Sequence, residues 1–284
     1  MTSNSIQEEY FGHEHLTFIR PTRGWRSLDL KELWAYRELL WVLTMRDIKV
    51  RYKQTVLGVG WAVIQPLMLM VVFSVFFGRL AKMPSDNLPY PIFSYTALLP
   101  WTFFANALGN SAGSVVGASN LISKVYFPRL IIPLASVGSW LLDFLIATVI
   151  LLMMMLWYGL GWTLNLLAVP ALVLVVVFIA LGAGTFLAAL TVAYRDFRYV
   201  IPFLLQFWMF ATPVVYPASI VPEHWQWVMR LNPMCGLIEG FRSAFLGRPF
   251  QLGALVLSLG VAVGLFLIGI AYFERVERRF ADII

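Results

Sequence analysis

Six apolar stretches occupy most of the chain and constrain its fold more than any other feature. A helix that crosses the hydrocarbon core of a bilayer needs about 20 predominantly apolar residues. Stretches of this kind occur at about 56–80, 92–114, 133–158, 166–193, 200–216 and 253–273. The second is interrupted by Asn106 and Asn110, and the fifth is short and contains a proline. The pattern predicts an all-α polytopic membrane protein with six transmembrane helices.

Composition excludes the main alternative classes of protein. Of the 284 residues, 60% are hydrophobic and 13% are charged, whereas about 25% are charged in an average soluble domain. This composition rules out an ordinary cytosolic enzyme, a disordered protein and a nucleic-acid-binding module. The single cysteine, Cys235, allows neither an intramolecular disulfide nor a thiolate metal cluster. Residues 1–55 show no apolar core of a cleavable signal peptide, so the first span is expected to act as the targeting signal.

The distribution of basic residues predicts the orientation of the chain. Six spans place both termini on one side of the membrane, where Lys and Arg number 16, against 5 on the other side. Cytoplasmic loops carry the excess of Lys and Arg in membrane proteins. We therefore expect a multi-pass protein with both termini in the cytoplasm.

The segment before the first span is expected to lie on the membrane. Residues 1–28 read as a cytoplasmic leader, and residues 29–284 as one membrane domain. Within residues 29–54, apolar residues recur at helical spacing with basic residues between them. This pattern predicts an amphipathic interface helix. Its headgroup-contacting residues would be Trp34, Arg46, Lys49 and Arg51.

The segment between the fifth and sixth spans is apolar but too short to cross. Two apolar runs at about 222–247 are separated at Pro233. About 14 helical residues extend roughly 21 Å, which is less than the 30 Å hydrocarbon core. We expect two short re-entrant helices on the periplasmic side. Glu239 and Arg242 would then face water or protein.

Asp143 is the only acidic residue well inside a predicted span. A carboxylate at that depth costs at least about 2.5–3.5 kcal/mol and needs a partner or water. One interpretation is a polar point on a translocation path. The other is a structural acid that hydrogen-bonds to Asn106 or Asn110.

Aromatic residues and glycines each have two interpretations. Tyr95, Trp101 and similar residues fit an interfacial belt, or they line a pore in which rings stack on sugars. The pore interpretation gives a channel and gate set of Tyr95, Trp101, Phe104, Asn106, Asp143, Trp225, Pro233, Glu239 and Arg242. Glycines four residues apart, at 109, 113 and 117 and at 260 and 264, predict close helix packing within the chain or between subunits.

The loop after the second span mixes apolar with basic residues. It is either a simple topology signal or a short helix that docks on a cytoplasmic partner. The docking residues would be Asn120, Leu121, Lys124, Phe127, Pro128 and Arg129. No HExxH or GxxxxGK[ST] motif occurs in the chain, so we expect no catalytic residue and no metal site, and another subunit would supply energy.

Several stretches together resemble a known family. The run Arg46-Asp-Ile-Lys-Val-Arg-Tyr-Lys-Gln-Thr-Val-Leu-Gly-Val-Gly-Trp-Ala-Val-Ile-Gln-Pro66 resembles the lead-in to the first span of ABC-2 type permeases, especially those that export O-antigen and teichoic acid. Further stretches agree in order over about residues 30–275: 120–129, 194–198 with Thr212-Pro213, and Asn232-Pro-Met234 with Glu239-Gly-Phe-Arg242.

The resemblance implies a homodimer in the bacterial inner membrane with two copies of a separate ABC ATPase. That ATPase would hold ATP and magnesium, and this chain would bind no cofactor and no nucleic acid. Residues 120–129 would form the coupling helix, assisted by Arg195 and Arg198, and residues 222–247 would form gate helices.

The resemblance also implies a substrate, namely an undecaprenyl-linked polysaccharide that crosses through a channel at the dimer interface. Gln65-Pro66, where capsule exporters usually have Glu-Pro, favours O-antigen. The alternatives are capsule, teichoic acid, a small lipo-oligosaccharide or drug, and a membrane-embedded glycolipid transferase.

Overall fold

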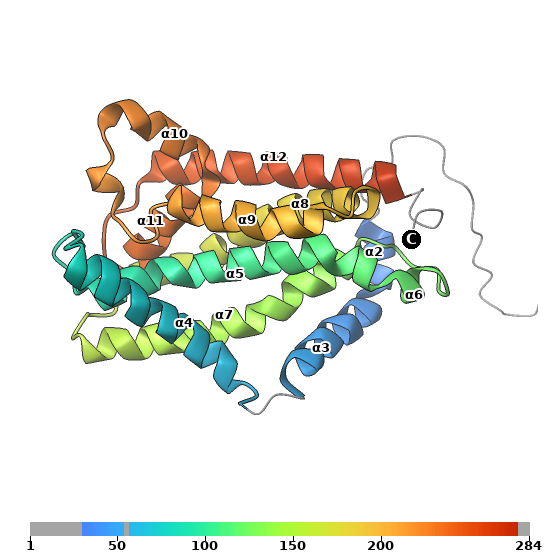
Figure 1. Ribbon diagram of the computed structural model, residues 1–284, viewed down its shortest axis with the longest axis horizontal. Coiled ribbons are helices and arrows are strands. Elements are labelled where there is room, and N and C mark those ends of the chain that lie inside the picture. The colour runs from blue at the N-terminus through green and yellow to red at the C-terminus, as the bar shows by residue number, and fades with distance from the viewer. Residues whose placement is uncertain (1–29, 54–56, 278–284) are drawn as a thin grey trace, which may run out of the picture.

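The computed structural model describes residues 30–53 and 57–277 as a bundle of helices (Figure 1). Every regular element in these ranges is helical, so the prediction of an all-α protein is confirmed. The predicted leader, residues 1–28, lies outside the described residues.

Four helices in the described ranges are long and apolar enough to cross a membrane: Gly60–Leu80, Ile131–Trp157, Leu164–Ala193 and Leu252–Glu277. The first joins α4 (Gly60–Phe73) to a π-helix, η1 (Ser74–Leu80). The third joins a 3-10 helix, η2 (Leu164–Ala168), to α8 (Val169–Ala193). The others are α7 (Ile131–Trp157) and α12 (Leu252–Glu277). They coincide with the predicted spans one, three, four and six.

The second and fifth predicted spans differ from these four. Helix α5 (Tyr90–Gly117) has 28 residues, and 18 of them are buried. It runs through the middle of the bundle, where it packs on α7 and α8 (Figure 1). Helix α9 (Phe197–Phe210) is apolar but has only 14 residues. It is shorter than the expected span at 200–216 because the chain turns at Ala211.

Helices α8 and α12 approach so closely that their backbones touch. A Cβ atom on Gly182 of α8 would lie 2.5 Å from the backbone nitrogen of Phe266. A Cβ atom on Gly269 of α12 would collide with the carbonyl of Gly182. The glycines predicted from their spacing are different residues: Gly260 and Gly264 have nothing within 4 Å of a built Cβ. Spacing therefore identified the right helix but not the face that packs within the chain, and packing of Gly260 and Gly264 between subunits stays a prediction.

The predicted interface helix is divided in two and packs on the bundle. Helices α2 (Leu30–Ala35) and α3 (Arg37–Lys53) meet at Tyr36. Helix α3 lies along α7, where Leu43 is buried and the methyl group of Thr44 lies beside Gly138. The opposite face of α3 exposes Trp41, Val42 and Val50.

The chain between α9 and α12 forms short helices. After η3 (Ala218–Ile220) and η4 (Glu223–Trp225), α10 (Gln226–Leu231) leads into α11 (Pro233–Leu246). The side chain of Asn232 caps α11 by accepting from the backbone N–H of Met234, and Pro233 occupies the first helical position. Gly247 ends α11 with a φ of 68°, in the left-handed region that glycine favours. Helix α11 is buried among α5, α8 and α12.

The bundle has two distinct ends, which we name after the helices there. The α6 end holds α2, α6 (Ser119–Ile122) and the last turn of α12 (Figure 1). The α11 end holds η1, α10 and α11. A separate apolar cluster forms the core at the α6 end, around Leu43, Phe127 and Phe273.

Substitution of Gly182 by Ala is expected to destabilise the fold. Overpacking a tight contact costs about 1–3 kcal/mol, because the added methyl has only backbone to displace. Gly264→Ala is the matched control in α12, since its methyl enters open space and Ala favours helix. The midpoint of thermal unfolding in detergent should fall for Gly182→Ala and stay or rise for Gly264→Ala. Equal midpoints would contradict the backbone contact.

Candidate functional site

The loop between α5 and α7, at the α6 end, has one side buried in the bundle and one side exposed. Ile122 and Phe127 are buried in the apolar cluster of that end. Asn120, Lys124 and Tyr126 are exposed. The docking helix predicted over 120–129 is a four-residue helix, α6, followed by a turn. Phe127 therefore anchors the loop to its own chain, and the exposed residues are the ones that can meet a partner.

Tyr126 is an exposed residue that the sequence analysis did not select. It is 63% exposed and stands beside Val125, which is 53% exposed. Limited burial, and then the nearby carboxylate of Glu32, raise the pKa of Tyr126 above the ordinary tyrosine value. Its phenol thus stays a hydrogen-bond donor at neutral pH. The sequence signal was its place between apolar residues in a basic loop.

Arg129 connects this loop to the end of α12. Its guanidinium donates to the backbone carbonyl of Glu277, and its backbone N–H donates to the Glu277 carboxylate at 3.2 Å. Arg129 and Pro128 are half-buried. Arg129 was predicted to contact a partner protein. In the structure its side chain already binds Glu277 of the same chain.

The two predicted coupling segments lie together. Arg195 is exposed on the turn between α8 and α9, and Arg198 is exposed in the first turn of α9. They line one groove of about 420 Å³ with Ser119, the first residue of α6. Leu121 is half-buried on the same short helix. The structure therefore places both segments on one surface at the α6 end.

Of the residues predicted for the interface helix, three point outward and one does not. Trp34, Arg46 and Lys49 are exposed. The guanidinium of Arg51 instead donates to Asp143 at 2.8 Å and to the hydroxyl of Ser139 at 3.0 Å. It also lies over the ring of Trp140, with 3.5 Å from Cζ to the ring centroid. The expectation that Arg51 contacts headgroups is wrong, because α3 turns it toward α7.

Asp143 has partners other than the expected asparagines. Arg51 forms an ion pair with one carboxylate oxygen, and the hydroxyl of Tyr52 donates to the other. Asn106 shares a small cavity of about 40 Å³ with Asp143, while Asn110 donates to the backbone carbonyl of Asn106. The ion pair joins α3 to α7 and supports the structural interpretation of Asp143.

The predicted aromatic lining is buried within the single chain. Tyr95, Trp101 and Phe104 are 0%, 3% and 0% exposed. Tyr95 donates to the carbonyl of Ala147 at 3.2 Å, and Trp101 and Phe104 pack against Trp208. These residues cannot line a channel surface in this conformation, because α5 is central in the bundle.

Motif residues from distant parts of the sequence meet at the α11 end. The indole of Trp208 donates to the side-chain oxygen of Asn232 at 3.0 Å. The amide of Asn232 in turn donates to the hydroxyl of Thr212 at 2.8 Å. The Thr212-Pro213 and Asn232-Pro233 motifs are thus one hydrogen-bonded unit. Pro233 is buried, and Trp225 is 55% exposed on η4.

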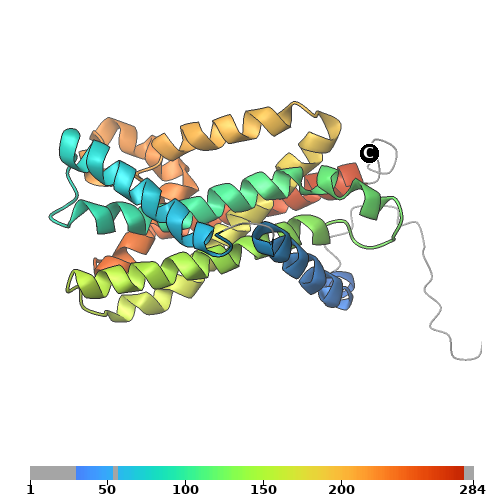
Figure 2. The same cartoon turned by 60° about the horizontal axis from the view of Figure 1, so that its bottom comes forward.

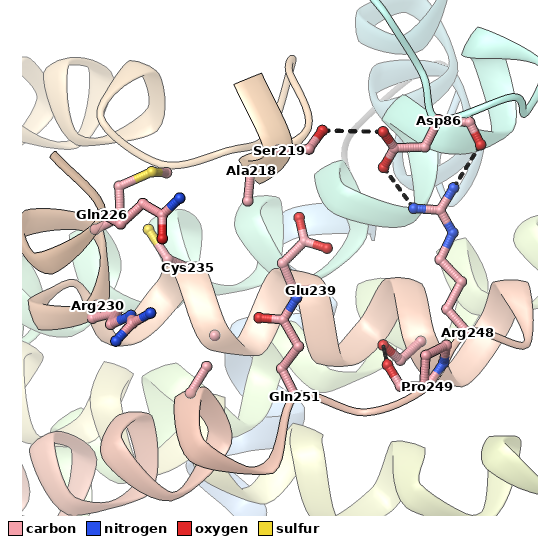
Figure 3. A pocket seen from close by; sticks show the side chains of 14 residues that line it. Asp86, Ala218, Ser219, Gln226, Arg230, Cys235, Glu239, Arg248, Pro249 and Gln251 are labelled. Atoms are coloured by element: carbon pink, nitrogen blue, oxygen red, sulfur yellow. Dashed lines mark hydrogen bonds and ion pairs between the residues drawn. The ribbon is translucent and has the colours of Figure 1, made fainter. Parts of the chain in front are cut away.

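A fully buried arginine lies next to this unit. Arg242 pairs with Glu239 at 2.7 Å and donates to the carbonyl of Val214 at 3.1 Å. Its guanidinium also lies over the ring of Phe93 at 3.8 Å. Glu239 is on the wall of a cavity of about 340 Å³, shown in Figure 3. Arg242 therefore faces protein, and Glu239 faces the cavity.

The Arg51–Asp143 pair is expected to stabilise the chain. Removing one partner of a buried pair costs about 3–5 kcal/mol and of a surface pair about 0–1 kcal/mol. At 24% and 16% side-chain exposure we expect about 1–3 kcal/mol for Arg51→Gln or Asp143→Asn. The double variant should lose less than the sum of the two, as measured by unfolding in graded SDS.

The exposed pair Arg46–Asp47 provides the control for this cycle. Asp47→Asn removes a pair of nearly the same length, 2.9 Å, with 49% and 28% side-chain exposure. We expect a loss below about 0.5 kcal/mol. Strict additivity of Arg51→Gln and Asp143→Asn would show that the two side chains do not interact.

Comparison with known proteins identifies the family of the chain. Residues 38–246 match the ABC-2 type transporter family. The O-antigen export system permease protein RfbA of Myxococcus xanthus is 30% identical over 257 residues, which are 89% of this chain and 98% of the relative. An RfbA protein of Klebsiella pneumoniae is 28% identical over 91% of this chain and 100% of its own length. The polysialic acid transport protein KpsM of Escherichia coli is 24% identical over 83% of this chain and 92% of its own length.

The matched segment runs from the first turn of α3 to the last residue of α11. It includes the loop at the α6 end and the hydrogen-bonded motif unit at the α11 end. The chain belongs to the ABC-2 type transporter family.

Proposed function

We propose that this chain is the permease subunit of an ABC transporter that exports a lipid-linked polysaccharide, O-antigen, across the bacterial inner membrane. The observation that carries the proposal is the similarity, over about nine-tenths of the chain, to permeases named for O-antigen export. The polysialic acid transport protein is more distant, at 24% identity. The higher identity to the O-antigen permeases favours O-antigen over capsule as the substrate.

Six spans and cytoplasmic termini are part of the proposal. Helix α5 has 28 residues, and at 1.5 Å per residue it extends about 42 Å, enough to cross a bilayer. Its polar side chains are tolerated because the helix is surrounded by protein. Helix α9 extends only about 21 Å over its 14 residues, so in this proposal the fifth crossing also uses residues 211–216, the turns that follow it. The excess of basic residues then assigns the α6 end to the cytoplasm and the α11 end to the periplasm.

A separate ABC ATPase is proposed to dock at the α6 end. The exposed residues Asn120, Lys124, Val125 and Tyr126 form one part of the surface, and Arg195 and Arg198 form the other. ATP and magnesium would be held by that partner, and the chain would contribute no catalytic residue. Movement of the loop would reach α12 through the contact between Arg129 and Glu277.

The homodimer is proposed to form through α9. In this helix only Ile201 is buried, and Figure 2 shows α9 on the outside of the bundle. Phe203, Phe207 and Phe210 are 69%, 67% and 48% exposed. Aromatic rings on α9 of two copies would therefore border the channel, in the role first expected of Tyr95 and Trp101.

The alternatives have less support. A capsule, teichoic acid or small-molecule permease would share the fold and the docking surface. The acid considered for a glycolipid transferase, Asp143, is instead held by Arg51 and Tyr52.

A deletion strain tests the exported substrate and the docking surface together. Without the gene, undecaprenyl-linked polymer should accumulate in the cytoplasm and surface O-antigen should be lost. The native chain should restore export. Lys124→Glu should restore less than about a tenth of it, because reversing an exposed charge opposes partner docking by more than about 1.4 kcal/mol.

Lys82→Glu is the control for charge reversal, since Lys82 is exposed at the opposite end of the bundle. It should export normally, and both variants should show native amounts of folded protein. Purified transporter carrying Lys124→Glu should also show lower ATPase activity. Full export and full ATPase activity for Lys124→Glu would contradict the docking role of Lys124. Normal surface O-antigen in the deletion strain would contradict the proposed substrate.

The dimer is tested by crosslinking through an introduced cysteine. In a Cys235→Ser background, Phe207→Cys should form a disulfide-linked dimer on oxidation in membranes, because α9 would face its own copy. Val149→Cys, on the exposed side of α7, should stay monomeric. A dimer band for Val149→Cys and none for Phe207→Cys would place the interface elsewhere.

A further inference from the structure

A cavity of about 340 Å³ with a mixed polar and apolar lining opens at the α11 end, between α10 and α11. Figure 3 shows Gln226 and Arg230 on one side, Glu239 and Gln251 in the middle, and the pair of Asp86 and Arg248 on the other side. The volume is at the lower end of the range for small-molecule sites, about 300–1,000 Å³. Its lining comes from residues between 218 and 254 and from Asp86, which is distant from them in the sequence. The fold thus builds a site of suitable size for a small ligand.

Most of the charged groups at the cavity wall are already paired. Arg248 pairs with Asp86 at 2.6 Å and also donates to the Asp86 backbone carbonyl at 2.9 Å. Glu239 pairs with the buried Arg242 behind the wall. Arg230 forms no ion pair within the described part of the chain. Two acids and two arginines line the cavity, and Arg242 compensates Glu239 from behind. The site therefore offers no net negative charge to a metal cation. The guanidinium of Arg230 can donate to hydroxyls or to an anion, so phosphate is the competitor to test.

The remaining polar groups are suited to hydroxyls. The side-chain amides of Gln226 and Gln251 each offer a donor and an acceptor. Glu239 has a second carboxylate oxygen besides the one that binds Arg242. Between these groups lie apolar side chains, among them Met229 and Ala254. Mixed amide, carboxylate and apolar contacts match a neutral sugar ring, which has hydroxyls at its edge and C–H groups on its faces.

We propose that this cavity binds a neutral sugar unit of the exported polymer as it leaves the membrane. The inference rests on the proposed function, because a polysaccharide brings such units to this end of the bundle. A bound sugar would contact Gln226 and Arg230 of α10 together with Glu239 of α11. It would thereby hold α10 against α11.

Binding is tested by saturation-transfer NMR on the full-length protein in nanodiscs. The probes are the methyl glycosides of glucose, galactose, mannose, rhamnose and N-acetylglucosamine, with inorganic phosphate as the charged competitor. At least one glycoside should bind, and phosphate should not displace it. The double variant Gln226→Leu and Gln251→Leu should bind it about 10-fold more weakly, as the loss of two hydrogen-bonding side chains predicts.

His224→Leu is the matched control, since His224 is exposed on η4 and outside the cavity lining; it should bind like the native chain. Met229→Trp is a second variant that fills the cavity, and it should also abolish binding. Absence of binding by every glycoside, displacement by phosphate, or native binding by both cavity variants would overturn the inference.

Complementation of the deletion strain separates this inference from the proposed function. Normal export by the native chain with no glycoside bound would overturn the sugar site alone. Glycoside binding without any restored export would overturn the assignment of the ligand to an exported polymer.

Discussion

The backbone contact between α8 and α12 at Gly182 and Gly269 positions the rest of the structure. With α12 fixed on α8, its last residue, Glu277, lies beside the loop of Arg129. Near its other end, α12 lies so close to α11 that a Cβ on Gly236 would come within 2.7 Å of the Ala254 carbonyl. One helix therefore touches both the α6-end loop and the buried helix of the α11 end.

Charged groups inside the bundle are found where two segments must keep a fixed register. Arg51 and Asp143 fix α3 on α7, and Arg242 joins α11 to the turn that contains Val214. A charge in a low-dielectric interior needs a partner and hydrogen bonds. Because Arg242 has a carboxylate, a carbonyl and an aromatic face around it, α11 can carry a cation in an apolar setting.

Much of the fold could be predicted from local sequence, and most of the contacts could not. Four of the six predicted spans follow from apolar length, and the limits of α11 follow from Asn232, Pro233 and Gly247. The partner of Asp143 is 92 residues away in the sequence, and no local pattern identifies it. Spacing of glycines selects one helix face but not its neighbour, which is why Gly264 was predicted and Gly269 makes the contact.

In the candidate site, too, local sequence predicted the unusual segments but not the contacts of their side chains. The composition of the 118–129 loop predicted that it is not an ordinary solvated turn. Which side chains face outward depends on packing, so Phe127 proved to be an anchor and Tyr126 an exposed residue. The aromatics of α5 were assigned to a channel because burial against protein and lining of a pore favour the same residue types. Only the central position of α5 separates the two.

The contact between Arg129 and Glu277 has a consequence for how the chain is made. The loop is synthesised 148 residues before Glu277, so its contact with α12 can form only after that helix has been made. Until then, within the described part of the chain, only the apolar cluster around Phe127 can hold the loop. The contact thus makes the final position of this loop depend on the completion of α12.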